Sequence, residues 1–174
     1  MKINFILNFK YSSYFSFILV VNPRCDPLII FENYKILIND SKFNQPTEIK
    51  RAKFSDDVYF SEAIFEEKLL IAMSCFNDKA LFYNTVFNYL EITGCEFRRL
   101  FDISCNNQIE NQNINNFNCI HSSFFGSSSF RARKFSGITI FKNLDFNQAP
   151  LFANAVFAQD ITLNNMRFYD VESE

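Results

Sequence analysis

Large apolar residues recur along this chain every eleven residues, and phenylalanine occupies most of these positions. One ladder consists of Phe43, Phe54, Phe65, Phe76 and Phe87, followed by Phe135, Phe146, Phe157 and Phe168. A second ladder lies between them and consists of Ile49, Phe60, Ile71 and Phe82, followed by Phe130, Phe141, Phe152 and Leu163. Merged, the ladders place a large apolar residue at alternating steps of five and six. Such a fixed period is typical of repeat architectures.

The spacing excludes both an amphipathic helix and a flat strand. On a helix, a five-residue step turns by about 140° and a six-residue step by about 240°, so the two ladders would face different sides. On a strand, side chains alternate between faces, and an odd step reverses the face. Residues five apart can all point inward only if the chain turns a corner between them. The pattern therefore predicts short strands wound into coils that pair through parallel hydrogen bonds.

The residue two positions before each large residue supports this coil, because positions i and i−2 share one face of a strand. Before the five-step members this residue is small, as in Ser41, Ala52, Ala63, Ser74, Thr85, Cys95 and Ala155. Before several six-step members it is bulkier, as in Val58, Leu69 and Leu90. We expect both sets to point inward, and the alternation indicates two kinds of side in each coil.

The segments Ala63-Ile64-Phe65 and Leu151-Phe152-Ala153-Asn154-Ala155-Val156-Phe157 resemble pentapeptide-repeat proteins, in which a small residue, any residue and a central Leu or Phe recur. The alternating spacing is similar to the Phe-rich branch of that family, and the resemblance covers roughly residues 38–168. It implies an all-β fold, a right-handed quadrilateral parallel β-helix. The chain departs from the family pattern by using Ile at several centres and by an irregular middle stretch.

Four sides of five, six, five and six residues make a coil of roughly 22 residues, which gives about six coils between Ile38 and Phe168. Residues one coil apart are then predicted to stack, as Phe43, Phe65 and Phe87 would. We expect residues 36–174 to form this β-helix and residues 1–35 to be an N-terminal capping or targeting segment. The apolar run from Tyr14 to Val21 is too short to span a membrane. A cap on the first coil, a targeting or membrane-attachment segment and a wrongly chosen start codon all remain open.

The middle stretch, residues 106–118, is rich in asparagine. Ile103, Ile109, Ile114 and Ile120 keep steps of six, five and six, so the ladder can continue through it as a coil. The alternative is a projecting loop that breaks the solenoid, and the resemblance then makes it the best candidate for a specific contact. Other asparagines two residues after a ladder member are interpreted as turn residues: Asn84, Asn143, Asn154 and Asn165.

Little in the sequence points to chemistry, and we predict no catalytic, cofactor-binding or metal-binding residues. His121 is the single histidine and is interpreted as a turn residue. An acidic cluster is expected to be solvated and consists of Asp56, Asp57, Glu62, Glu66 and Glu67. Two basic spots are expected to be solvated as well and consist of Arg98 with Arg99, and of Arg131 with Arg133 and Lys134. We therefore expect a protein that is not an enzyme and uses no cofactor.

Charge and cysteine content narrow the remaining possibilities. The net charge is −2, and the five cysteines are odd in number and widely spaced. Reduced thiols in a cytoplasmic protein are the favoured interpretation, with Cys95 as a core residue.

The leading hypothesis is a non-catalytic β-helical scaffold or protein-interaction module with an unidentified protein partner. The open last coil would be covered by the acidic tail, residues 170–174, or by a homodimer contact through the C-terminal coil. One alternative, implied by the resemblance, is a DNA mimic that inhibits or protects DNA gyrase, although the interleaved Lys and Arg count against it. The other alternative is a membrane-associated repeat protein attached through residues 1–21. Direct binding to nucleic acid is not expected.

Overall fold

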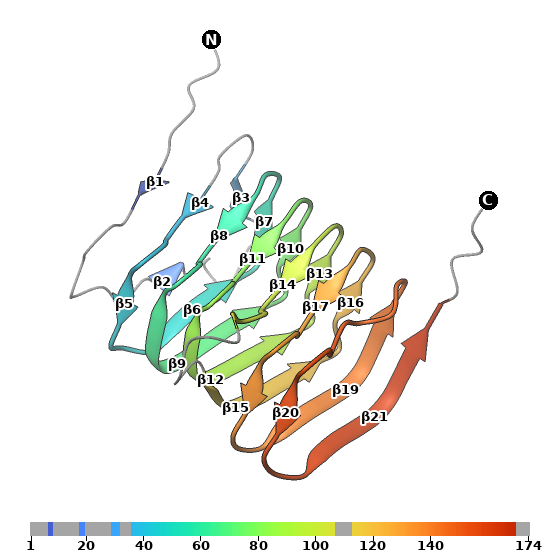
Figure 1. The fold of residues 1–174 in the computed structure, drawn as a ribbon. Helices are drawn as coiled ribbons and strands as arrows, with labels where there is room; N and C mark the ends of the chain where they lie inside the picture. The colour runs from blue at the N-terminus through green and yellow to red at the C-terminus, as the bar shows by residue number, and fades with distance from the viewer. Residues whose placement is uncertain (1–6, 9–17, 20–28, 32–35, 107–112, 170–174) are drawn as a thin grey trace.

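The computed structural model describes residues 7–8, 18–19, 29–31, 36–106 and 113–169. Every regular element in this part of the chain is a β-strand, and the strands stack in parallel along one axis (Figure 1). The coil that starts at Val58 illustrates the repeat. It contains β8 (Val58–Tyr59), both halves of the long strand β9 (Ile64–Ala72) and β10 (Cys75–Phe76), which together form four sides. The predicted all-β, four-sided parallel β-helix of about six coils is confirmed.

The strands fall into two sheets. The first sheet contains β1 (Leu7–Asn8), β4 (Ile36–Leu37), β8, β11 (Ala80–Leu81), β14 (Phe101–Asp102) and β17 (Ser128–Ser129). The second sheet contains β9, β10, β2 (Ile18–Leu19), β3 (Ile29–Phe31), β5 (Lys42–Phe43), β6 (Thr47–Lys50), β7 (Ala52–Phe54), β12 (Val86–Thr93), β13 (Glu96–Phe97), β15 (Asn113–Ile120), β16 (Ser123–Phe124), β18 (Lys134–Phe135), β19 (Thr139–Phe146), β20 (Val156–Phe157) and β21 (Ile161–Phe168).

Strand register sets the repeat length. Phe65 pairs with Phe87, and Thr139 pairs with Ile161 at the same step, which is the repeat of about 22 residues. A bulge after Phe87 shortens the next step to 21, so that Phe76 pairs with Phe97. Across the middle stretch the step rises to 27, because Phe87 pairs with Ile114 and Phe97 with Phe124. The coil therefore resumes in register after extra residues have been inserted, and residues 107–112 lie outside the described part.

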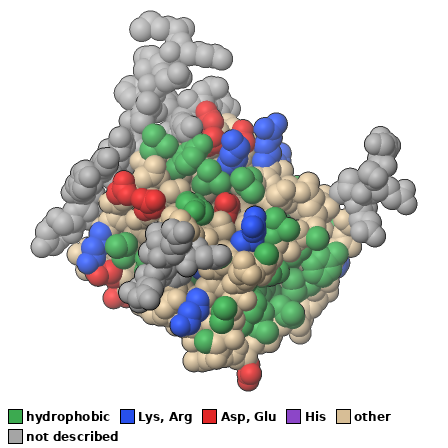
Figure 2. Space-filling view, in the orientation of Figure 1, with side chains coloured by type: hydrophobic (Ala, Val, Ile, Leu, Met, Phe, Trp, Pro, Cys, Tyr) green, Lys and Arg blue, Asp and Glu red, His purple; other side chains and the backbone are tan. Residues whose placement is uncertain are grey.

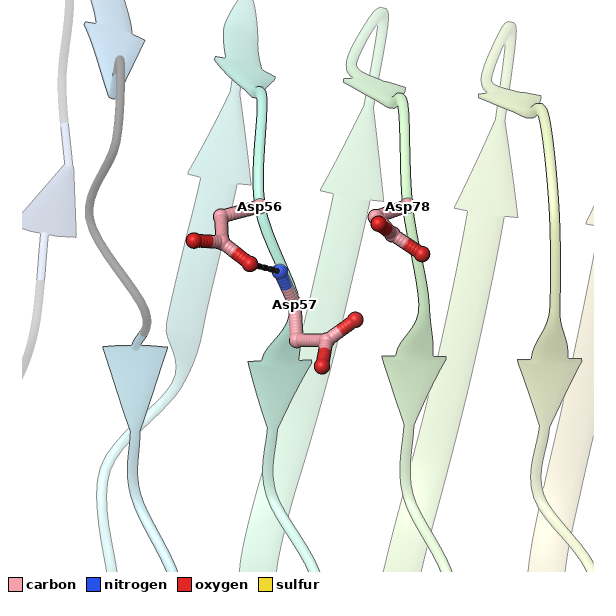
Figure 3. A group of neighbouring side chains, drawn as sticks. All are labelled: Asp56, Asp57 and Asp78. Atoms are coloured by element: carbon pink, nitrogen blue, oxygen red, sulfur yellow. Dashed lines mark hydrogen bonds between the residues drawn. The ribbon is translucent and has the colours of Figure 1, made fainter.

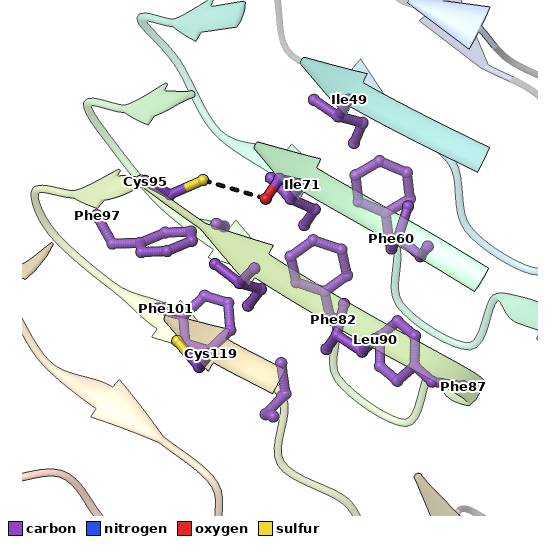
Figure 4. Close-up of a cluster of buried hydrophobic side chains, with 14 of the residues drawn as sticks. Ile49, Phe60, Ile71, Phe82, Phe87, Leu90, Cys95, Phe97, Phe101 and Cys119 are labelled. Carbon is purple, nitrogen blue, oxygen red and sulfur yellow. Dashed lines mark hydrogen bonds between the residues drawn. The ribbon is translucent and has the colours of Figure 1, made fainter. Parts of the chain in front are cut away.

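The ladder residues form the core as stacks parallel to the axis (Figure 4). Phe43 stacks on Phe65 with ring centroids 4.6 Å apart, and Phe60 stacks on Phe82 at 4.9 Å. The predicted small inward residues are buried where they lie within the inner coils, namely Ser41, Ala52, Ala63, Ser74, Thr85 and Cys95. The predicted bulkier ones, Val58, Leu69 and Leu90, are buried too. The ring stack and the small residues that make room for it thus fill the interior together.

One predicted ladder member is wrong. Ile103 and Ile114 are fully buried as expected, but Ile120 points outward and is only half-buried. Cys119 takes the inward position instead, paired in register with Ile92. The bulge after Phe87 causes this difference, since it moves the inward set one residue toward the N-terminus. Ile109 lies outside the described residues.

The corners are built largely without glycine. Gly94 has a positive φ, and the other left-handed corners carry side chains: Asp40, Arg51, Glu62, Met73, Asn84, His121, Ala132, Asn143, Asn154 and Asn165. Each of these side-chain-bearing corners lies two residues after a ladder residue or, at His121, after its replacement Cys119. The turn role predicted for the four asparagines and for His121 is confirmed. Asn and Asp tolerate this conformation, whereas for other residues it costs roughly 1–2 kcal/mol.

Three short strands within residues 1–35 pair in parallel with the first full coils, as in the pairing of Leu7 with Ile36 and of Ile29 with Ala52. Most of the segment lies outside the described residues, so its predicted capping or targeting role stays a prediction.

The core stack predicts a large cost for losing one inner ring. Phe82 is fully buried and stacks on Phe60, so Phe82→Ala is expected to lower the free energy of unfolding by about 3–5 kcal/mol. Phe125 is 44 % exposed, and Phe125→Ala should change stability by less than about 0.5 kcal/mol. Urea denaturation of both variants measures this difference, and equal losses would contradict the stacked core.

The strained corners predict opposite effects for two Ala→Gly changes. At Ala132 φ is 53°, so Ala132→Gly relieves the left-handed strain and should raise the free energy of unfolding by about 0.5–1 kcal/mol. Ala153, an exposed residue outside the left-handed set, should lose about 0.5–1 kcal/mol on the same change because glycine only adds unfolded-state freedom. Urea midpoints that move in the same direction for both variants would argue against strained corners.

Candidate interaction surface

The last described coil leaves large apolar side chains exposed at the end of the stack. They are Leu151, Val156, Leu163, Phe168 and Tyr169, each between 48 and 60 % exposed. A broad hydrophobic area is visible over this end of the molecule (Figure 2). We call it the terminal-coil surface, together with Phe152, Phe157 and the outer edge of β21.

Ladder rings at this end are stacked on one side. Phe152 lies 4.8 Å from Phe130, and Phe157 lies 4.8 Å from Phe135, each toward the preceding coil. Strand β21 pairs with β19, and within the described residues no strand covers its other edge. Among the described residues, the terminal-coil surface therefore presents both apolar area and a strand edge with no strand beside it, the two features that drive strand-edge association.

Three carboxylates come together on the side of the early coils: Asp56, Asp57 and Asp78, with oxygens within 4.8 Å of one another (Figure 3). The sequence prediction placed Asp56 and Asp57 in a cluster with Glu62, Glu66 and Glu67 instead. Glu66 forms an ion pair with Lys42 at 2.6 Å, and Glu62 occupies a corner. The sequence does indicate that Asp78 lies beside Asp56, because the two residues are one full repeat apart and therefore belong to adjacent coils.

Neighbouring cations and donors already engage this acidic group. The Asp57 carboxylate accepts a hydrogen bond from the Tyr59 hydroxyl at 2.7 Å and lies 3.9 Å from the Lys79 ammonium. The Arg99 guanidinium lies 3.8 Å from Asp78. Oxygen ligands of this kind suit hard cations, but here protein cations offset their charge. Asp57 is buried and Asp56 and Asp78 are half-buried, so the prediction that Asp57 is solvated is wrong, and the group is a partly buried charge network.

The two predicted basic spots differ in how far their side chains are buried. Arg98 pairs with Glu96 at 3.1 Å on the surface, as a solvated charge should. The prediction that Arg133 belongs to a solvated spot is wrong, because its side chain is fully buried. Sequence reasoning could have found this, since Arg133 lies two residues before Phe135, where the other coils place a small inward residue.

His121 occupies a corner column with Asn143 and Asn165, which follow it one and two coils on. The Asn143 side-chain amide lies 3.2 Å from the His121 ring, and Asn165 donates to the Asn143 oxygen at 2.8 Å. The column links corners of successive coils through their side chains.

A polar hollow of about 330 Å³ opens on the face of the first sheet, beside the coil with the longer step. Its lining includes Tyr83, Asp102, Ser104, Arg131 and Asn154. Tyr83, Arg131 and Asn154 are exposed, so the hollow is an open surface feature.

The four described cysteines are free thiols. Cys95 and Cys119 are buried, and burial raises the pKa of Cys95 to about 12 and that of Cys119 well above its usual value. The Cys95 thiol donates to the Ile71 carbonyl oxygen at 3.4 Å (Figure 4). Cys75 and Cys105 are half-buried. The core role predicted for Cys95 is confirmed.

In comparisons with known proteins, no family model, no curated protein and no solved structure matches this chain. In the described part of the chain, no helix is both long and apolar enough to cross a membrane.

Thiol burial predicts two classes of cysteine reactivity. In a Cys25→Ser background at pH 8, a thiol reagent should modify Cys75 and Cys105 in the folded protein. Cys95 and Cys119 should react only after denaturation, because the reagent cannot reach their buried sulfurs, and burial raises their pKa values as well. Mass spectrometry of the labelled peptides measures this, and rapid native labelling of Cys95 would contradict the described core.

Proposed function

We propose that this chain is a non-catalytic β-solenoid of the pentapeptide-repeat type that acts as a protein-interaction module. The four-sided coil of about 22 residues and the small inward residue two positions before the ladder rings support this kinship. The observation that carries the functional proposal is the terminal-coil surface, where exposed apolar side chains meet an unpaired strand edge. Solenoids require their apolar ends to be covered.

We further propose that a second copy of the chain is a partner at this surface. Two copies related by a two-fold axis would place their β21 strands side by side in antiparallel orientation, so that the surface covers itself. Asp160 lies just before this strand and Arg167 near its end. An antiparallel pair would place Asp160 of each copy near Arg167 of the other, which Asp145 of its own chain already holds through two hydrogen bonds.

Outward charges favour an interaction module over a DNA mimic. A DNA mimic that binds gyrase would require continuous rows of Asp and Glu side chains that imitate the phosphates of DNA. One outward row of residues contains basic, acidic and uncharged side chains. It follows the register of β7, β10, β13, β16, β19 and β21 and consists of Lys53, Cys75, Glu96, Ser123, Asp145 and Arg167. Arg167 and Asp145 pair within that row at 2.6 Å. This mixture supports a surface of paired, solvated charges.

A cytoplasmic location is part of the proposal, and the free thiols support it because reducing compartments preserve them. Attachment to a membrane through residues 1–21 remains the alternative for a segment of which the structure describes only 7–8 and 18–19.

Sedimentation velocity over a range of concentrations tests the self-association. The wild-type chain is expected to form dimers, and Leu163→Asp should yield monomers because it places a carboxylate in the apolar contact. Ile138→Asp is the matched control, since Ile138 is 58 % exposed but lies outside the terminal-coil surface, and it should stay dimeric. Circular dichroism checks that both variants fold. A monomeric wild-type chain, or equal effects of the two changes, would overturn the proposal.

A further inference from the structure

Arg133 is a large cation in a place where the solenoid otherwise holds a small side chain. Its position belongs to the inward column of Ser41, Ala63, Thr85 and Ala155. The side chain is fully buried among the core rings, with its guanidinium 5.9 Å from the centre of the Phe87 ring. Burial of an arginine requires hydrogen-bond acceptors for its donors.

The guanidinium donates to main-chain carbonyl oxygens of the two preceding coils. Nε donates to Ile103 at 2.5 Å and Nη1 to Thr85 at 2.7 Å. Nη2 lies 3.4 Å from the carbonyl oxygens of both Phe82 and Ser104. One side chain therefore bonds to the backbone on both coils that approach the interrupted corner.

Phe82 and Ser104 also accept main-chain hydrogen bonds, from Thr85 N–H at 3.2 Å and Asn84 N–H at 3.0 Å, so the comparison with uninterrupted coils concerns the carbonyls of Ile103 and Thr85. In uninterrupted coils, main-chain N–H groups donate to the carbonyls equivalent to these two. The carbonyl oxygen of Phe60 accepts from Ala63 N–H at 3.1 Å, and that of Phe152 accepts from Ala155 N–H at 2.9 Å. Ile103 is the equivalent residue in the interrupted coil. Likewise the Ala63 carbonyl accepts from Val86 N–H at 2.9 Å, one coil on, and Thr85 is the residue equivalent to Ala63. Arg133 donates to the carbonyls of both Ile103 and Thr85, at the corner where the regular path of the described coils is interrupted.

The chain path explains why the donors are needed there. Phe82 and Phe87 are five residues apart, as are Phe130 and Phe135, whereas Ile103 and Ile114 in the intervening coil are eleven apart. Six residues are thus added at this corner, between ends that return to register. A buried carbonyl without a donor is costly, and the planar fork of arginine reaches several carbonyls at once.

We propose that Arg133 is an internal clamp that allows the solenoid to accept inserted residues at this corner. Its side chain donates to the carbonyls of Ile103 and Thr85 in place of main-chain donors and fills the interior of the interrupted coil, so that the ends of the insertion stay in register. The protonated guanidinium donates these hydrogen bonds. Burial lowers the pKa of Arg133 to about 10, which is still high enough for the side chain to be charged at pH 7. The clamp is independent of self-association through the terminal coil.

A double-mutant cycle tests the coupling between Arg133 and the insertion. In the full chain, Arg133→Ala should lower Tm by about 5 °C or more, because buried carbonyls lose their donors. The second background lacks residues 107–112 and carries Asn106→Ala, which restores the five-residue step and its small inward residue. There Arg133→Ala should raise Tm, since the arginine no longer has a gap to fill. Equal losses in both backgrounds would overturn the clamp.

Two further variants keep the test decisive if the shortened chain does not fold. Arg133→Met keeps apolar bulk without donors, so its Tm should fall nearly as far as that of Arg133→Ala. A Tm equal to that of the wild type would overturn the proposal. Replacing residues 107–112 with six Gly and Ser residues should leave Tm within about 3 °C, because the clamp holds the ends of the insertion. A loss as large as that of Arg133→Ala would show that the inserted sequence itself holds the corner. All Tm values are compared at one protein concentration.

Discussion

Stacking of large apolar side chains from successive coils is the interaction on which the rest of this structure depends. Ladder rings pack on equivalent rings one coil away, as Phe54 does on Phe76 at 4.8 Å, and the hydrogen bonds between parallel strands run along the same axis. To keep every ring inward at odd spacing, the backbone must turn at each corner, even where this forces Met73 or Ala132 into a left-handed conformation. Core packing therefore outweighs local backbone preference.

Such stacking has no natural end, which links the fold to the proposed function. A ring in the middle of the solenoid has neighbours on two sides, whereas Phe168 is stacked on Phe146 and remains 59 % exposed. The forces that assemble the coils also favour covering the terminal-coil surface. Along the sides of the solenoid, opposite charges pair from coil to coil, as in Lys68 with Glu91 at 2.7 Å. Those sides thus carry paired charges, whereas the last described coil brings several large exposed apolar residues together.

The period made the coil, its length and most of its core predictable, because each depends only on which residues recur at odd steps. Three features escaped. The bulge after Phe87 turns Cys119 inward in place of Ile120. A shift of one residue leaves the apolar residues of the ladder almost unchanged, so the sequence pattern does not reveal it. The pairing of Asp78 with Asp56 and Asp57 depends on stacking from coil to coil rather than on proximity in sequence. Arg133 was assigned to the surface by its charge, although its column indicated the interior.

Contacts between residues far apart in the chain test the central claim most directly. In a protein with selectively labelled phenylalanine, NMR should detect ring contacts between residues one regular repeat apart before the interruption, as between Phe43 and Phe65. Across the interruption the contacts should join residues that are further apart in the sequence, as between Phe97 and Phe124, whose centroids lie 5.0 Å apart. Contacts confined to neighbours within one or two helical turns, or the regular repeat throughout the chain, would contradict this account.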